Sequence, residues 1–476
     1  MQMSFSNENP MTEEETGSIG KSKKQLKKEN AWRANGPRDP FAMVGDFKRC
    51  IRTHLCENYL ENVRHGKQQQ IQKALHLFST GSTLPKSLQQ AQTYQYRFWD
   101  TQPVPKLGDT VTTHGPVAET EASIREKPYS LPEGFSWDTL DISSPPVLKE
   151  LCSLLNENYT EDDDNTIRFH FSAEYLQWAL QPPNWQAQWH CGVRVNTNKK
   201  LVGFIAAIPA DLSIYELQVV QVRFLCVHRK LRLKRMTPVL IRELTRRVNL
   251  QGLRQAVYAA GVVVPTPLSS CRQWHRPLNV RKLMEVNYPG LKENMNLQRT
   301  LKFLRLPQTT KIPGMRPMTH EDSPRVLSLL QKSLSRFHLR PVLSLQDVQH
   351  WLVPRESVID SYVIEGDDGE LTDVVSFYRV SFKVLNHPFH STLRAAHLFY
   401  IASAATDQAD LVEDSLVLAK AVSKGLDVVT ALDVMDNNSF LEKVKFSISP
   451  IGVHYYLYNW MCPTMKPDKV GLLLPN

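Results

Sequence analysis

The stretch from Phe224 to Ile241, FLCVHRKLRLKRMTPVLI, combines residue types that could bind an anion. Four mostly apolar residues run into five cations within seven positions, and a Thr-Pro pair then begins an amphipathic pattern. The pair predicts a helix with Thr237 as its N-cap and Pro238 as its first helical residue. A helix N-terminus favours phosphate, because its free N–H groups and its macrodipole both attract negative charge. The five cations would reach further phosphate oxygens; they are Arg229, Lys230, Arg232, Lys234 and Arg235.

An apolar strand end beside a phosphate site suits a ligand that has an apolar part and a polyphosphate head. Acyl-CoA has this shape, and the alternative is an ordinary basic loop on a sheet. Cys226 lies two residues before His228, which would suit a nucleophile and its base. The alternative for Cys226 is a small strand residue without a chemical role. The seven cysteines are scattered and contain no C-x-x-C pair, so we predict no disulfide framework and no metal site.

Composition indicates a soluble globular protein. The 476 residues are 42% hydrophobic and 22% charged, which allows one to three domains with a sizeable core. No apolar run approaches the roughly 20 residues that a transmembrane helix needs. The polar, acidic start MQMSFSNENPMTEEET does not resemble a signal or transit peptide, so we expect a cytoplasmic protein.

Residues 1–75 read as a disordered basic tail, with KSKKQLKKEN as its most charged part. The net charge of +9 favours an anionic partner. The tail could dock on RNA or the ribosome through phosphates, or it could simply be a solvated segment.

The rest of the chain alternates strand and helix patterns. Residues 145–159 place four leucines on one helical face, and residues 200–215 and 217–228 are two successive Val- and Ile-rich strands. Residues 361–382 predict a hairpin that turns at an Asp-Asp-Gly, and residues 410–434 predict a helix followed by a strand. We therefore predict an α/β fold with two mixed halves of similar size.

The segment that begins at Phe224 also resembles the signature of the N-myristoyltransferases, which move myristate from myristoyl-CoA to an N-terminal glycine. The resemblance extends over roughly residues 70–476 and includes YRFWDTQPVPKLGD, NENYTEDDDN, QPPNWQAQWHCGVRV, WHRPLNVRKLMEV and YYLYNW. It implies two GNAT-type acyltransferase halves related by a pseudo-two-fold axis. Residues 76–285 would hold myristoyl-CoA, residues 286–476 would hold much of the peptide, and myristoyl-CoA would bind first.

The resemblance also implies roles for individual residues. The backbone N–H groups of Phe224 and Leu225 would stabilise the oxyanion, and the C-terminal carboxylate at Asn476 would be the base. Myristoyl-CoA would contact Arg97, Phe98, Trp99, Phe224, Leu225, Cys226, Val227, Leu233, Lys234, Arg235, Met236 and Thr237. The peptide would contact Tyr159, Glu161, Asp162, Asp163, Asp164, Phe169, Ala259, Gly261 and His275. For Phe169 the alternative is core packing, and for the four acids it is a solvated loop.

Several positions depart from the family pattern. The family's EINFLC reads QVRFLC here, which places Gln221 for an acid and Arg223 for an amide. Its glycine-rich KFGxGDG reads KFSISPIG over 445–452, where a proline fixes φ and a lost aspartate would weaken recognition of basic peptides. Asn476 extends the chain by one residue past the usual end at Pro475, which could move the carboxylate by about 3.5 Å.

These departures leave three functions open. The first is an active glycylpeptide N-myristoyltransferase, with myristoyl-CoA as co-substrate and no prosthetic group. The second is a divergent relative that binds acyl-CoA or peptide and transfers slowly or not at all. The third is an acyltransferase with a shifted acceptor, such as a lysine side chain. In each case we expect a monomer without DNA as a partner, associated at most with the ribosome or a membrane surface.

Overall fold

The computed structural model describes residues 84–118, 124–159, 166–214, 217–288, 291, 296–385, 387–422 and 425–475. The predicted basic tail, the acidic run from Glu161 to Asp164 and the final Asn476 lie outside these residues. No helix in the described part of the chain is long and apolar enough to cross a membrane.

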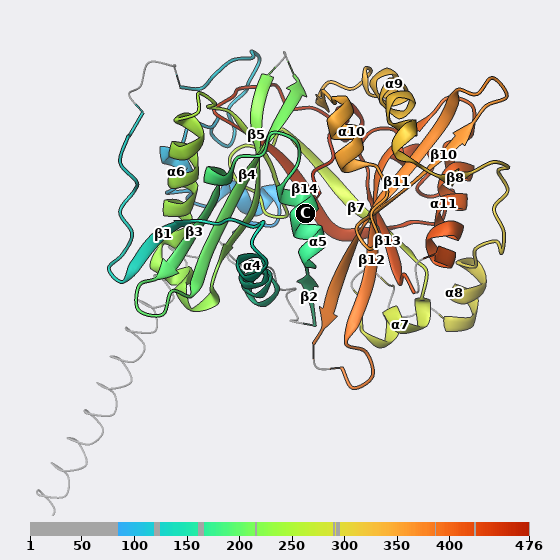
Figure 1. The fold of residues 1–476 in the computed structure, drawn as a ribbon, viewed down its shortest axis with the longest axis horizontal. Helices are drawn as coiled ribbons and strands as arrows, with labels where there is room; N and C mark the ends of the chain where they lie inside the picture. Colours follow the sequence, from blue (N-terminus) through green and yellow to red (C-terminus); the bar gives the residue numbers. More distant parts are fainter. Residues whose placement is uncertain are drawn as a thin grey trace, which may run out of the picture. The chain divides into compact units, whose positions relative to one another are not determined.

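One large mixed sheet organises the described residues (Figure 1). Its main path runs β1-β3-β4-β5-β6-β14-β7-β13-β12-β11-β10-β8, while β2 pairs with β11 and β9 pairs with β4. The strands are β1 (Phe135–Thr139), β2 (Ile167–His170), β3 (His190–Val195), β4 (Leu201–Ser213), β5 (Leu217–Val227), β6 (Ala256–Ala260), β7 (Ser269–Pro277), β8 (Arg316–Pro317), β9 (Arg340–Pro341), β10 (Ile359–Glu365), β11 (Leu371–Val384), β12 (Thr392–Ser403), β13 (Val428–Leu432) and β14 (Ser447–Tyr458).

The described helices lie around this sheet, and several of them pack on its strands. They are α3 (Leu88–Gln92), α4 (Pro145–Asn158), α5 (Ala173–Leu180), α6 (Met236–Asn249), α7 (Val280–Glu285), α8 (Leu297–Phe303), α9 (Ser323–Leu334), α10 (Leu345–Trp351) and α11 (Gln408–Val422). Short 3-10 turns include η2 (Trp99–Thr101) and η4 (Arg229–Lys234). The predicted leucine face of α4 is confirmed, because Leu148, Leu151, Leu154 and Leu155 are all buried.

The predicted pairs of strands and the hairpin at Asp367–Gly369 are confirmed. One helix boundary is wrong. Helix α6 begins at Met236 and its N-cap is Arg235, so Thr237 and Pro238 lie inside the first turn. A proline fits anywhere in that turn, since the first N–H groups of a helix have no intrahelical acceptor, and the pattern alone therefore left the start open by two residues.

One strand pattern occurs twice in the sheet. Strands β3, β4 and β5 are antiparallel and β5 runs parallel to β6; likewise β10, β11 and β12 are antiparallel and β12 runs parallel to β13. Each pattern is completed by a strand from the other part of the chain, since β14 pairs with β6 and β7 pairs with β13. Strands β7 and β14 also pair with each other, which makes the sheet continuous. The α/β fold with two related halves is thus confirmed, while a division at residues 285 and 286 stays a prediction.

The parallel contact between β5 and β6 is short. Its register covers only Val220 with Ala256 and Gln221 with Val257. The remainder of β5 and of β6 therefore does not continue this pairing, and side chains from both strands line one cavity. The last described residue, Pro475, also lines this cavity.

Candidate active site

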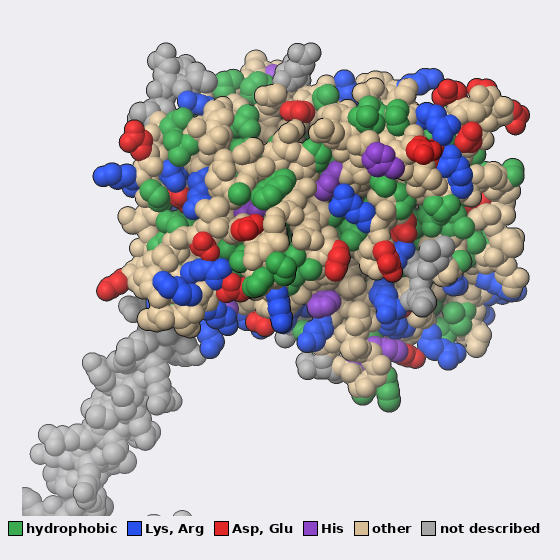
Figure 2. Space-filling model, in the orientation of Figure 1, with side chains coloured by type: hydrophobic (Ala, Val, Ile, Leu, Met, Phe, Trp, Pro, Cys, Tyr) green, Lys and Arg blue, Asp and Glu red, His purple; other side chains and the backbone are tan. Residues whose placement is uncertain are grey.

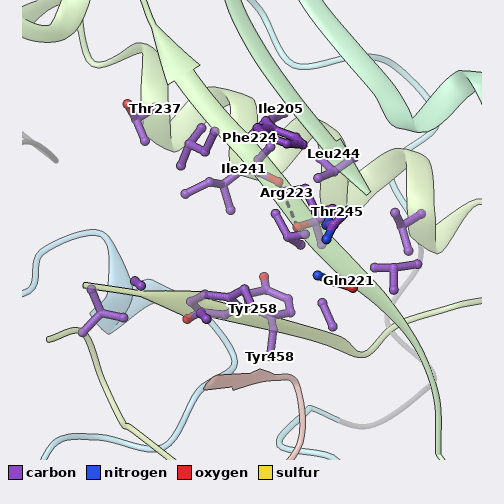
Figure 3. Close-up of a pocket in the computed structure, with 18 of the residues that line it drawn as sticks. Ile205, Gln221, Arg223, Phe224, Thr237, Ile241, Leu244, Thr245, Tyr258 and Tyr458 are labelled. Atoms are coloured by element: carbon purple, nitrogen blue, oxygen red, sulfur yellow. Dashed lines mark hydrogen bonds between the residues drawn. The ribbon is translucent and has the colours of Figure 1, made fainter. Parts of the chain in front are cut away.

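A mostly apolar cavity of about 250 Å³ lies among β5, β6 and α6 (Figure 3). Helix α6 contributes one apolar face to it, through Ile241, Leu244 and Val248, and the C-terminal segment contributes Leu474 and Pro475. Helix α6 presents these residues together because they recur at helical spacing. The cavity therefore suits a long apolar group, and its walls come from segments more than two hundred residues apart in the chain.

A bulge in β5 lies at this cavity. The register of β5 on β4 pairs Cys226 with Phe204 and Arg223 with Ala206, so two residues, Phe224 and Leu225, face the single Ile205. Phe224 has a φ of 51°, in the left-handed region that a non-glycine side chain rarely adopts. A bulge disrupts the regular ladder at its extra residue. Backbone N–H groups at this point can be directed at a ligand, and both residues line the cavity.

The basic loop forms η4 and leads into α6. Two of its arginines bind the C-terminal end of α4: Arg229 donates to the carbonyl oxygen of Glu157 at 2.7 Å, and Arg232 donates to that of Asn158 at 2.6 Å. These carbonyls are at the negative end of a helix, where cations are favoured. At least one donor of Arg229 and of Arg232 is thus used within the fold. The contact of the five cations with phosphate stays a prediction. Lys230, Lys234 and Arg235 are exposed, Leu233 lies within η4, and Met236 is buried at the start of α6.

The aromatic cluster of the sequence borders the same cavity. Trp99 stacks on Tyr258 with ring centroids 5.9 Å apart, and Phe98 meets Trp99 edge-on at 5.3 Å. The guanidinium of Arg242, on α6, lies 5.6 Å from the centre of the Phe98 ring. Arg97 is exposed and points its Nε towards the side chain of Gln95 at 3.4 Å. Phe98 and Trp99 thus line the same cavity as Phe224 and Leu225, while their contact with CoA stays a prediction.

Cys226 is not arranged as a nucleophile. Its Sγ lies 4.0 Å from the carbonyl oxygen of Leu154, and burial raises the pKa of the thiol to about 12. His228 has left the strand, and its Nδ1 accepts the backbone N–H of Lys230 at 3.3 Å. The interpretation of Cys226 as a strand residue is therefore confirmed, and Val227 is likewise buried in the core.

The residues predicted to meet a peptide fall into two groups. Tyr159 and Ala259 line the cavity with Phe224, and the Tyr159 ring lies 5.9 Å from the Phe224 ring. Phe169 stacks on Phe171 at 5.5 Å and packs on Phe382 at 4.6 Å, so core packing accounts for much of its environment. Gly261 follows β6, and His275 is buried on β7 with its ring edge-on to Tyr288.

Sequence reasoning placed the base at Asn476, the end of the chain, but it did not foresee the contact between the neighbouring Pro475 and Arg223. Arg223, Leu474 and Pro475 line the cavity, and Arg223 Nη2 donates to the carbonyl oxygen of Pro475 at 2.5 Å. The apolar composition of the tail predicts its burial, and residues 471–473 and 475 are buried. No local pattern, however, pairs the tail with β5.

Fold and cavity together define a class of protein: an α/β acyltransferase with a duplicated strand pattern, an apolar pocket at a strand bulge and a basic loop before a helix. The model of the myristoyl-CoA:protein N-myristoyltransferase N-terminal domain matches residues 116–271, and that of the C-terminal domain matches residues 285–473. The chain belongs to the N-myristoyltransferase family.

Relatives and solved structures agree with this assignment. The chain is 57% identical over 410 residues to glycylpeptide N-tetradecanoyltransferase 2 of Danio rerio, covering 86% of this chain and 83% of that protein. It is 53% identical over 410 residues to the Bos taurus protein of the same name, covering 86% and 82%. The crystal structure of Saccharomyces cerevisiae N-myristoyltransferase with bound myristoyl-CoA superimposes with a TM-score of 0.76 at 36% identity, covering 80% of this chain and 99% of that one.

Proposed function

We propose that this chain transfers the myristoyl group of myristoyl-CoA to the N-terminal glycine amine of a protein or peptide. The observation that carries the proposal is the β5 bulge at Phe224 and Leu225, which borders an apolar cavity and lies a few residues before the basic loop. The acyl chain would occupy the cavity between β5 and α6. The phosphates of CoA would lie at the exposed Lys230, Lys234 and Arg235, next to the N-terminus of α6.

The proposed reaction needs no covalent intermediate on the enzyme. The glycine nitrogen attacks the thioester carbonyl carbon, a C–N bond forms, the C–S bond breaks and CoA leaves as its thiol. The carbonyl oxygen carries negative charge in between, and the N–H groups of Phe224 and Leu225 would stabilise it. The buried Cys226 thiol takes no part in these steps.

The glycine ammonium must lose a proton before or during the attack. We propose the carboxylate at Asn476 as the acceptor, because its neighbour Pro475 lines the cavity beside the bulge. The acids Glu161 to Asp164 would attract basic residues of the peptide, since they follow Tyr159, which also lines the cavity. Phe169, Ala259, Gly261 and His275 are kept as candidate peptide contacts.

We further propose that the enzyme works as a cytoplasmic monomer whose residues 1–75 can dock on the ribosome or another anionic surface. Five lysines in KSKKQLKKEN support this proposal. On the face drawn in Figure 2, cationic and anionic side chains are interspersed, so this face of the described residues does not compete with the tail as a basic patch.

The direct test is mass spectrometry of a peptide that begins Gly-Ser, incubated with the purified protein and myristoyl-CoA. We expect one myristoyl group on the glycine amine, and none on a matched peptide with an N-acetylated glycine. A tight complex with myristoyl-CoA but no product would contradict the transferase. Acylation of a lysine in the acetylated peptide would contradict the proposed acceptor.

A further inference from the structure

Arg223 lies inside the protein, on β5, at the residue before the bulge. Only 5% of it is exposed. Its Nη1 donates to the carbonyl oxygen of Ala179, in the last turn of α5, and its Nη2 donates to the carbonyl oxygen of Pro475 at 2.5 Å. The guanidinium also lies 5.6 Å from the centre of the Trp351 ring on α10. One side chain therefore connects β5, α5, α10 and the C-terminal segment.

The positive charge of Arg223 is buried and is not paired with an acidic side chain among the described residues. Among the described residues its hydrogen-bond acceptors are neutral carbonyls, and its Nε has no partner. Burial lowers the pKa of Arg223 to about 10, which still leaves it protonated at neutral pH. A buried cation is costly unless its donors are used, so the two carbonyl contacts are expected to be well maintained.

The C-terminal segment from Gly471 to Pro475 is hydrogen-bonded to distant residues of the fold. Gly471 N donates to the carbonyl oxygen of Leu339 at 2.7 Å, and the Tyr455 hydroxyl donates to that of Leu472 at 2.8 Å. Leu473 N donates to the Tyr400 hydroxyl at 3.3 Å. These contacts fix residues 471–473, and Arg223 supplies the next contact, at Pro475, where the segment reaches the cavity.

We propose that Arg223 is a positioning residue, which fixes the C-terminal segment at the reactive end of the acyl pocket. This inference rests on the proposed function, because the segment supplies part of the wall beside the Phe224–Leu225 bulge. An arginine can donate to two carbonyls at once through its planar fork, whereas a lysine has one nitrogen at the end of a flexible chain. The bridge between Ala179 and Pro475 therefore needs an arginine and not only a positive charge.

The test compares the wild-type chain with R223M, R223K and a control variant, R355M. The exposed Arg355 is close to α10 and contacts His350 at 3.4 Å, outside the cavity. Hydrogen exchange of the Leu473 and Leu474 amides, the nearest N–H groups to Pro475, reports the position of the segment. Steady-state kinetics with a Gly-Ser peptide reports transfer. For R223M and R223K we expect at least tenfold faster exchange and at least tenfold lower kcat, with the Kd for myristoyl-CoA within threefold of wild type.

R355M is expected to match the wild type in all three measurements. Unchanged exchange in R223M would overturn the proposal, whatever happens to kcat, because the segment would then be held without Arg223. Faster exchange with unchanged kcat would also overturn it, since the role would be purely structural. If the wild-type chain transfers no myristate, the proposed function fails, and the exchange measurement alone still decides whether Arg223 holds the segment.

Discussion

Trp99 and Tyr258 stack with their ring planes 12° apart and their centroids 5.9 Å apart. The contact joins η2 to β6 in the sheet. Tyr258 in turn stacks on Tyr456 of β14 at 4.9 Å. Trp99 and Tyr258 line the cavity, so a column of three aromatic rings from three distant segments supports part of its wall.

Removing the Trp99 ring should weaken binding of myristoyl-CoA. An aromatic pair contributes about 1 kcal/mol beyond the area that it buries, and W99A also removes part of the cavity wall. We expect the Kd of W99A to rise by roughly tenfold. W99F retains an aromatic ring, so its Kd should stay within about threefold of that of the wild type. Isothermal titration calorimetry measures the Kd of both variants. Equal affinities for W99A and wild type would show that the ligand does not use this wall.

The bulge predicts a backbone effect that side-chain substitution does not reproduce. L225P removes one N–H donor, whereas L225A retains it. Loss of one oxyanion donor costs about 10²- to 10³-fold in kcat, so we expect a fall of that size for L225P and a fall below tenfold for L225A. Circular dichroism and the myristoyl-CoA Kd establish that each variant is folded. Similar kcat values for the two folded variants would remove Leu225 from the oxyanion site.

Cys226 should be dispensable for catalysis. Its thiol is buried and its pKa is raised to about 12, so the reactive thiolate is scarce at neutral pH. We expect C226A to keep kcat within about twofold and to lose a modest amount of stability, because a small cavity replaces the sulfur. Intact-mass spectrometry of the wild-type enzyme during turnover should detect no acyl adduct on Cys226. Such an adduct, or an inactive but folded C226A, would contradict the direct-transfer mechanism.

We expect the cations of the basic loop to fall into two groups, those that bind the ligand and those that stabilise the fold. Lys230 and Lys234 are exposed, so K230A/K234A should weaken myristoyl-CoA about tenfold or more and flatten the dependence of Kd on salt. R232M breaks the contact to the carbonyl oxygen of Asn158, so it should mainly lower the free energy of unfolding. Chemical denaturation and binding at two salt concentrations distinguish these effects. A salt dependence unchanged in the double variant would place the phosphates elsewhere.

His190 should make the fold sensitive to acid. It is fully buried, its Nε2 lies 3.2 Å from the carbonyl oxygen of Leu180, and burial lowers its pKa from 6.5 to about 4. Below pH 6.5 the unfolded chain binds the proton more readily than the folded chain. The stabilisation is therefore complete above pH 6.5 and is lost as the pH falls towards 4, by about 3 kcal/mol at most.

H190Q removes this titration, so its free energy of unfolding should vary less between pH 7.5 and 4.5 than that of the wild type, even if it is lower at pH 7.5. Urea denaturation at both pH values measures the difference. H320Q, at an exposed histidine, serves as the control. A wild-type pH dependence that persists in H190Q would assign the acid sensitivity to other groups.

Local patterns in the sequence determined the elements of the fold. A composition rich in Val and Ile predicted β4 and β5, the spacing of leucines predicted α4, and the Asp-Asp-Gly turn predicted the β10–β11 hairpin. The cations before Met236 indicated an anion site, and the quoted segments identified the family. These properties depend on neighbouring residues, whose side chains and backbone angles are coupled along a single helix or strand.

The tertiary structure decided how these elements meet. Three features join residues that are far apart in sequence or on different strands. They are the exchange of β7 and β14 between the two strand patterns, the bulge opposite Ile205 and the hydrogen bond between Arg223 and Pro475. It also decided which cations stabilise the fold, since Arg229 and Arg232 donate to carbonyl oxygens at the end of α4. Such choices follow from packing and hydrogen bonding between distant surfaces, which no short stretch of sequence contains.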